Sequence, residues 1–192
     1  MPFYRFEEFG EEKLTPHLSS ARGPIIEGDY IYFCLVSKDP GTGSKLHYHP
    51  NELMIFPVAG KIHSLVGKDR RIVAPGTFIH IPPYARHQML ATEDGQIDYL
   101  YVKDRSWTVV GIAQDEAVPD AAPTVEAVNK EFDAGNYPGQ EKEPEKSEAI
   151  VEGLRNSYHP IIDSLDAPPF STLNYKWVEG ERLTFGFFDL PE

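Results

Sequence analysis

Three histidines in two separated clusters are the residues of this chain best suited to bind a metal ion. His47 and His49 stand two positions apart, and His87 follows a turn written Ile81-Pro82-Pro83. On a β-strand, side chains at positions i and i+2 project from the same face, so the first two imidazoles would point together. A third imidazole from another strand would complete a site for one divalent ion. The spacing therefore predicts a metal centre at His47, His49 and His87.

The elements that must position these histidines are short strands. Between Tyr30 and about Val110, runs of β-branched and aromatic residues alternate with Gly, Pro and Asp clusters, a pattern typical of an antiparallel all-β domain. The predicted strands are Tyr30 to Ser37, Leu53 to Val58, Lys61 to Val66, Thr77 to Ile81, Ile97 to Val102 and Thr108 to Ile112. Six or more short strands with tight turns predict a sandwich or barrel.

The composition shifts after about Gln114, which divides the chain into a barrel with an N-terminal arm (1–114) and a C-terminal extension (115–192). Helices are predicted over Val125 to Ala134 and over Ser147 to Asn156, with a charged linker from Gly139 to Ser147. Thr124 is the expected N-cap of the first helix, and Gly135 is expected to end it.

The last segment, Ser171 to Leu190, is predicted to form a β-hairpin around the turn Glu179-Gly180-Glu181. Apolar residues alternate on both sides of that turn, so the hairpin must cover something. It could extend a sheet, close the mouth of the barrel, or pack on a second subunit, which would make a homodimer.

Composition excludes some classes of function. The net charge of -12 over 192 residues argues against a surface that binds nucleic acid or anionic lipid. Cys34 is the only cysteine, so an intrachain disulfide is excluded and a reducing compartment is the simplest reading. The charged start and the lack of a long apolar run lead us to expect a cytoplasmic protein that does not span a membrane.

The residues from Gly41 to Ala91 resemble the two sequence motifs of the cupin superfamily. In the first motif, a glycine is followed at fixed intervals by two histidines, a glutamate and a second glycine; the matching residues here are Gly41, His47, His49 and Gly60. In the second motif, glycine, proline and histidine recur in the same way; they are Gly76, Pro82 and His87. The resemblance implies the cupin double-stranded β-helix, a jelly-roll barrel, here with a C-terminal helical and hairpin extension.

Leu53 is the most consequential departure from these motifs, because it stands where cupins carry an acidic metal ligand. Leucine has no donor atom, so the chain resembles the three-histidine cupins. Glu52 is adjacent, but strand alternation should turn it to the opposite face unless a β-bulge rotates it inward. Tyr84 and Ala91 replace a glycine and an asparagine outside the metal shell.

The resemblance to three-histidine dioxygenases of the diketone and hydroxyacetophenone type implies a mononuclear Fe(II) enzyme. It would use O2 to cleave a C–C bond in a small oxygenated substrate, such as a diketone, a hydroxyketone or an aromatic compound. An alternative keeps the site, with Zn, Mn or Ni, for a non-redox isomerase, lyase or decarboxylase. A third possibility is a barrel that binds a small molecule without reacting with it.

Further site residues are expected around the metal centre. The candidate proton carriers are Glu52, His80 and Tyr84. The candidate substrate contacts are Tyr48, Arg86, Gln88 and Tyr99.

Overall fold

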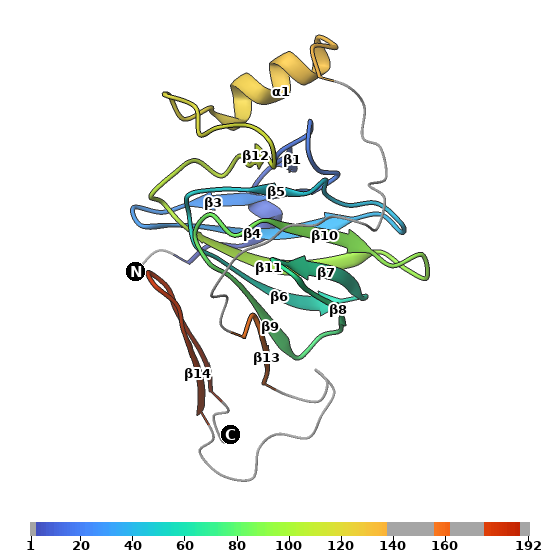
Figure 1. Ribbon diagram of the computed structural model, residues 1–192, viewed down its shortest axis with the longest axis vertical. Helices are drawn as coiled ribbons and strands as arrows, with labels where there is room; N and C mark the ends of the chain where they lie inside the picture. Colours follow the sequence, from blue (N-terminus) through green and yellow to red (C-terminus); the bar gives the residue numbers. More distant parts are fainter. Residues whose placement is uncertain (1–2, 138–155, 162–174, 189–192) are drawn as a thin grey trace.

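Two antiparallel β-sheets packed face to face form the body of the protein (Figure 1). This computed structural model describes residues 3–137, 156–161 and 175–188. The larger sheet contains β1 (Glu12–Lys13), β2 (Arg22–Gly23), β4 (Ile31–Lys38), β11 (Ile97–Asp104), β6 (Leu53–Ala59), β9 (Thr77–Ile81) and β13 (Tyr158–Pro160), with β3 (Ile25–Glu27) paired to β4. The smaller sheet contains β12 (Ile112–Ala113), β5 (His47–Tyr48), β10 (His87–Ala91), β7 (Ile62–Val66) and β8 (Asp69–Val73).

The chain crosses repeatedly between the two sheets, which is the topology of a jelly roll. Strands β4, β6, β9 and β11 belong to the larger sheet, whereas β5, β7, β10 and β12 belong to the smaller one. This path places β10 between β5 and β7, so segments far apart in the sequence become neighbours. The predicted cupin fold is confirmed.

Apolar side chains on the inner faces of both sheets form the main core. Along β4, every second side chain is buried, from Tyr32 through Cys34 and Val36 to Lys38. Inward side chains of β6, including Leu53 and Ile55, pack into the same core. Each fully buried aliphatic side chain of this kind contributes about 1.5–3 kcal/mol.

Two of the motif glycines are needed for their backbone conformation. Gly41 (φ 67°) and Gly60 (φ 73°) lie in the left-handed region, which residues with a Cβ rarely adopt. At Gly60 a Cβ would also lie 2.1 Å from the carbonyl oxygen of Gln96, so this turn admits only glycine.

One predicted strand is wrong in its extent, and several strands were not predicted, among them the five-residue β8 and β10. Instead of the expected strand over Thr108 to Ile112, only the short β12 forms, at Ile112–Ala113. Strands β8 and β10 add to the predicted set, and His87 is the first residue of β10.

The first C-terminal helix forms as predicted. Helix α1 (Val125–Asp133) begins after Thr124, whose hydroxyl accepts the N–H of Ala127 at 3.1 Å. Gly135, with φ 80°, follows its end. The 3-10 helix η1 (Phe6–Glu8) is the other described helix, and neither is long and apolar enough to cross a membrane. The predicted linker 139–147 and the helix from 147 lie outside the described residues, except Asn156.

The predicted C-terminal hairpin also forms, from β14 (Tyr175–Glu179) and β15 (Thr184–Phe188). Its apolar residues pack on the outer face of the larger sheet, in a cluster that includes Met54, Phe56 and Phe78. The rings of Phe78 and Phe185 meet edge to face at 4.7 Å. The hairpin therefore packs on the outer face of its own barrel, and it neither extends a sheet nor closes the barrel mouth. The homodimer stays a prediction.

Candidate metal centre

Strand pairing brings the three histidines together between the sheets. His47 of β5 and His87 of β10 are cross-strand partners, and His49 follows directly after β5. The ring centroid of His87 lies 4.2 Å from that of His47 and 4.7 Å from that of His49. The centroids of the His47 and His49 rings are 6.3 Å apart.

Each imidazole is held by the same kind of hydrogen bond. The Nδ1 atoms of His47, His49 and His87 lie 2.8, 2.9 and 2.9 Å from the carbonyl oxygens of residues 45, 51 and 85. A carbonyl only accepts, so each Nδ1 must carry the proton, and each Nε2 keeps a free lone pair. Metal-ligating histidines are commonly oriented by such bonds to the other ring nitrogen.

The electrostatics of the three rings also suit metal ligation. Burial, the largest cause, lowers the pKa of His47 and His49 well below the usual value and that of His87 to about 3. The imidazoles are therefore neutral at physiological pH, the form that binds a metal. The Nε2 of His49 is buried and has no hydrogen-bond partner in the described part of the chain. A buried imidazole nitrogen that makes no hydrogen bond is suited to bind a metal ion.

The trio is not drawn tightly around one point. Within residues 3–137, 156–161 and 175–188, no three His, Cys, Asp or Glu side chains form a preformed metal-binding group. Imidazole nitrogens bind Zn(II) at about 2.0–2.1 Å. The ring centroids of His47 and His49 are the farthest apart of the three pairs, so these two rings would have to move closer together to bind one ion.

Gly111 makes room for the ring of His47. A Cβ at this position would lie 2.6 Å from the Cδ2 atom of His47, closer than atoms of this kind approach. The N–H of Gly111 is held by the Thr15 hydroxyl at 3.2 Å, so the backbone here is fixed by the N-terminal arm. Even an alanine would displace the imidazole.

The histidines lie in the wall of a cavity of about 40 Å³ between the sheets. Leu53 stands in this wall, so the position of the missing acidic ligand does face the centre. Among the described residues that line the cavity there is no carboxylate, but there are two lysines. The lining residues are Leu14, Thr15, Ser19, Ala21, Lys38, Ser44, His47, His49, Leu53, Ile55, His87, Met89, Tyr99, Tyr101, Lys103, Val109 and Gly111.

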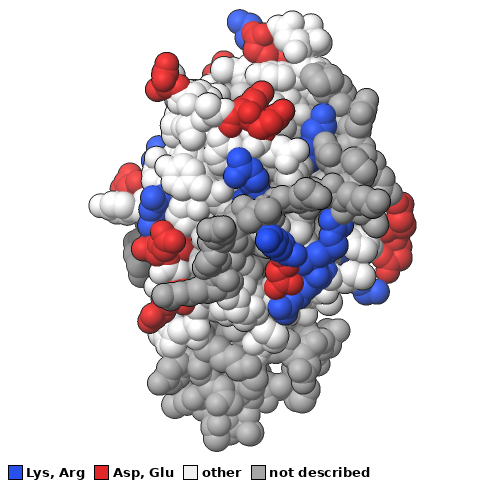
Figure 2. Space-filling model, in the orientation of Figure 1, with Lys and Arg blue, Asp and Glu red and all other residues white. Residues whose placement is uncertain are grey.

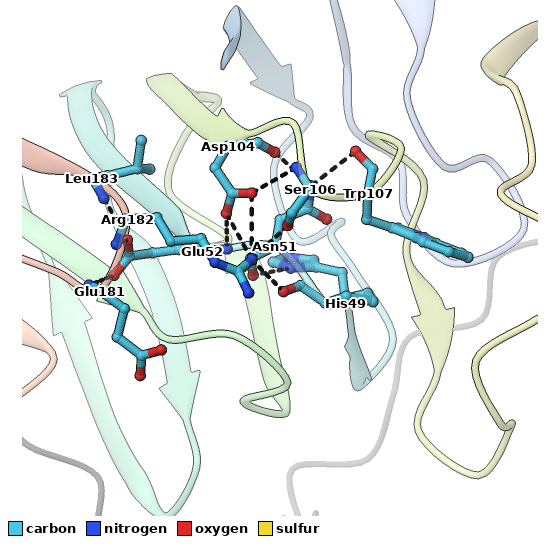
Figure 3. Close-up of polar contacts among 10 residues, drawn as sticks. His49, Asn51, Glu52, Asp104, Ser106, Trp107, Glu181, Arg182 and Leu183 are labelled. Atoms are coloured by element: carbon cyan, nitrogen blue, oxygen red, sulfur yellow. Dashed lines mark hydrogen bonds and ion pairs between the residues drawn. The ribbon is translucent and has the colours of Figure 1, made fainter. Parts of the chain in front are cut away.

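Glu52 points toward the hairpin turn (Figure 3) and does not line the cavity, as strand alternation predicts, so its assignment as a proton carrier is not supported. Its carboxylate is fully buried and accepts from the Nε2 of His80 at 2.6 Å. It also accepts the backbone N–H groups of Glu181, Arg182 and Leu183 at 2.6–2.7 Å. Burial raises the pKa of Glu52, but these hydrogen bonds outweigh it and leave the pKa lowered. Glu52 therefore anchors the hairpin turn as an ionised carboxylate.

The same turn reaches the loop that carries His49 (Figure 3). The Arg182 guanidinium donates to the carbonyl of Pro50 at 3.0 Å and to the Ser106 hydroxyl at 2.5 Å. Asn51, whose carbonyl orients His49, donates through its side chain to the carbonyl oxygens of Asp104 and Trp107. The hairpin thus supports this histidine from the opposite side of the sheet.

Most of the other predicted site residues lie outside the cavity. His80 is engaged by Glu52, and Tyr84 is exposed on a turn, where its N–H donates to the His49 carbonyl at 2.8 Å. Gln88 is buried but alternates with His87 and Met89, which do line the cavity. The assignments of His80, Tyr84 and Gln88 to direct contact with substrate or proton are therefore not supported by their positions.

Tyr48 and Arg86 contact each other at the edge of the barrel. The Arg86 guanidinium lies 5.2 Å from the centre of the Tyr48 ring and donates to the carbonyl of Gln114. The Tyr48 hydroxyl donates to the carbonyl of Glu116. Neither lines the cavity, whereas Tyr99, predicted as a substrate contact, does.

Comparison with known proteins agrees with this architecture. Residues 34–103 match the model of the Cupin domain family. No curated protein matches the chain. Similar solved structures include a cupin-2 domain protein from Rhodospirillum rubrum (20% identity over 69% of this chain and 86% of that one, TM-score 0.47). Another is the polyketide cyclase RemF from Streptomyces resistomycificus (18% identity over 54% and 79%, TM-score 0.49).

A third similar structure is oxalate decarboxylase from Bacillus subtilis, which has Mn(II) centres (16% identity, TM-score 0.56). The match covers 91% of this chain and 52% of the decarboxylase, so the chain spans about half the length of that protein. At this identity the likeness shows the fold alone. The chain thus has the two-sheet jelly-roll fold, and its residues 34–103 match the Cupin domain family.

Proposed function

We propose that the protein is a mononuclear metal-dependent cupin enzyme, a non-haem Fe(II) dioxygenase that cleaves a C–C bond in a small oxygenated substrate. The observation that carries the proposal is the donor set. Three neutral imidazoles present Nε2 atoms to one cavity, and Leu53 replaces the carboxylate that would fill a further position. A divalent ion held there supplies Lewis acidity, and Fe(II) adds the redox chemistry that reaction with dioxygen requires.

The chain's own residues define what the site accepts. Apolar and aromatic side chains, among them Ile55, Met89 and Tyr101, line much of the cavity. A cavity of about 40 Å³ holds roughly three water molecules, because each needs about 10–15 Å³. A cavity of this size favours the smaller members of the predicted substrate class.

The second candidate is a non-redox isomerase, lyase or decarboxylase at the same centre. It is favoured by a specific observation: two lysines line the cavity, and burial lowers the pKa of each to about 7. Such lysines could exchange a proton with substrate near neutral pH, a role for which Glu52, His80 and Tyr84 are misplaced. Turnover with and without oxygen separates the two candidates, and a barrel that only binds its ligand would show neither.

The deciding experiment is metal analysis of protein purified without oxygen. We expect about one divalent ion per chain in the wild type, and iron would favour the dioxygenase over its rival. His47→Ala and His87→Ala should lose the ion, because two imidazoles rarely hold one alone. The matched control is His63→Ala, which removes an exposed histidine of β7 and should keep full occupancy. Retention of the ion by His87→Ala, or its absence from metal-supplemented wild type, would contradict the proposal.

A further inference from the structure

Two lysines line the metal cavity, and none of the described residues that line it with them carries a carboxylate. Lys38 ends β4 and Lys103 lies in β11, and only 2% and 0% of their surfaces are exposed. The Nζ of Lys38 donates to the carbonyl of Met89 at 2.8 Å, and that of Lys103 to the carbonyl of Val109 at 2.9 Å. An ammonium group has three donors, so a single neutral acceptor leaves most of its hydrogen-bonding capacity unused.

Basic side chains at the surface are placed differently. Figure 2 shows acidic and basic residues interspersed on one face of the molecule, with basic groups gathered near the β7–β8 hairpin. Several surface cations pair with carboxylates, for example Arg71 with Asp69 at 2.9 Å and Lys61 with Asp94 at 3.2 Å. A buried ammonium without such a partner is costly, because it loses its hydration. Each lysine must therefore either release its proton or gain a compensating charge from a bound ligand.

The lysines stand next to the positions where a ligand would bind the metal. In the register of β11 with β6, Lys103 is the cross-strand neighbour of Leu53, the residue that replaces the acidic ligand. After burial, the charge of Lys103 is among the causes that lower the pKa of all three histidines, and Lys38 acts in the same way on His47 and His87. The cavity wall thus has leucine where the motif has an acidic ligand, and it carries two basic side chains.

We propose that Lys38 and Lys103 form a carboxylate-binding subsite, so that the substrate is a small carboxylic acid with an oxygen on the adjacent carbon. This inference rests on the proposed function and names its substrate class. A carboxylate bound in this cavity can accept a charge-assisted hydrogen bond from either ammonium group, and it supplies the negative charge that Leu53 cannot. The adjacent hydroxyl or keto oxygen would face the histidines.

The cavity walls agree with such a ligand. The Nζ atoms of Lys38 and Lys103 lie 5.7 and 6.0 Å from the ring centres of Tyr99 and Tyr101, within reach of a cation–π contact that helps to fix them. The cavity, of about 40 Å³, favours a small ligand. A neutral diketone of the same size would fit the space but leave both lysines without a counter-charge.

The test compares two probes of equal size on Zn(II)-loaded protein by titration calorimetry. Pyruvate carries a carboxylate next to a keto group, whereas 2,3-butanedione is its neutral analogue. Lys38→Met and Lys103→Met each keep the apolar stem of the side chain and remove the charged amine. We expect each variant to bind pyruvate about 10- to 100-fold more weakly, as the loss of a charge-assisted hydrogen bond implies, and to bind butanedione within twofold of wild type. Lys61→Met is the control for the loss of a surface charge.

Zinc content and circular dichroism are measured for each protein, so that misfolding is recognised directly. A change in pyruvate affinity of less than twofold in both variants, with one zinc per chain retained, would overturn the subsite and leave the metal centre intact. If wild type holds no zinc, the proposed function fails, and the subsite is decided on the metal-free protein. There pyruvate should still bind the wild type more tightly than the variants, and equal binding would refute the inference.

Discussion

The burial of Lys38 predicts an unusual dependence of stability on pH, which Lys38→Met should remove. Methionine keeps the long apolar stem and its packing, but it cannot carry a charge. The carbonyl of Met89, which accepts from Lys38 Nζ, keeps the backbone N–H of Ser44 at 3.0 Å, so the variant leaves no bare acceptor. The substitution is therefore close to a pure removal of one buried titratable group.

The magnitude follows from the pKa. Burial lowers the pKa of Lys38 from 10.5 to about 7 in the folded protein, while the unfolded chain keeps the ordinary value. Between these two values the unfolded state binds more protons, so this lysine makes the folded protein more stable as pH rises from 7 toward 10.5. Each pH unit contributes up to about 1.4 kcal/mol, and integration from pH 7 to 9.5 gives about 3 kcal/mol.

The assay is urea unfolding of metal-free wild type and Lys38→Met at intervals from pH 7 to 9.5. The variant should gain its largest advantage at pH 7, and that advantage should shrink by about 3 kcal/mol by pH 9.5. Lys68→Met, in the exposed turn between β7 and β8, should differ from wild type by less than about 0.5 kcal/mol throughout. Parallel curves for wild type and Lys38→Met would refute the reasoning, because they would mean that folding does not change the proton affinity of this lysine.

Three other substitutions test the site. Gly111→Ala should push the ring of His47 aside and weaken zinc binding by about tenfold or more in a competition titration, whereas Gly95→Ala, where a Cβ meets nothing within 4 Å, should not; equal affinities would disprove the close fit. Leu53→Glu should raise metal affinity and lower turnover, because a carboxylate would occupy a position meant for substrate; higher turnover would count against the open site. Glu52→Gln should cost about 2–3 kcal/mol of unfolding free energy through the hairpin turn, and a loss of metal in the folded variant would show that Glu52 acts at the centre after all.

The sequence could predict the parts of the structure that depend on short stretches of neighbouring residues. Thr124 and Gly135 mark the ends of α1 because capping and the left-handed conformation are properties of single residues. The motif spacing predicts the metal trio because β5 and β10 must pair to bury their apolar neighbours. The strand expected over Thr108 to Ile112 fails because the apolar residues there pack as a loop beside the N-terminal arm, and Gly111 serves the His47 ring.

The burial of Lys38 and Lys103 in the cavity wall could not be predicted from neighbouring residues alone. The predicted strands stopped at Ser37 and Val102, one residue short of Lys38 and Lys103, because a lysine ordinarily marks the end of a buried run. In the fold, pairing of β4 with β11 continues through both, with Ile97 opposite Lys38 and Tyr32 opposite Lys103. The available signal was alternation, since each lysine continues the inward-facing series of its strand. That this face lines a cavity becomes visible only in the folded structure, where the smaller sheet packs against it.

Strand β6 explains why the missing acidic ligand cannot be recovered by a small shift of the chain. Leu53 and Ile55 line the cavity, while Met54 and Phe56 hold the hairpin on the outer face, and Glu52 binds the hairpin turn. A slip of one residue would turn Glu52 inward but would also exchange every apolar contact on both faces. The Glu52 carboxylate therefore stabilises the hairpin turn and does not reach the metal centre. In the proposed subsite, the negative charge at that centre comes from the carboxylate of the ligand that Lys38 and Lys103 bind.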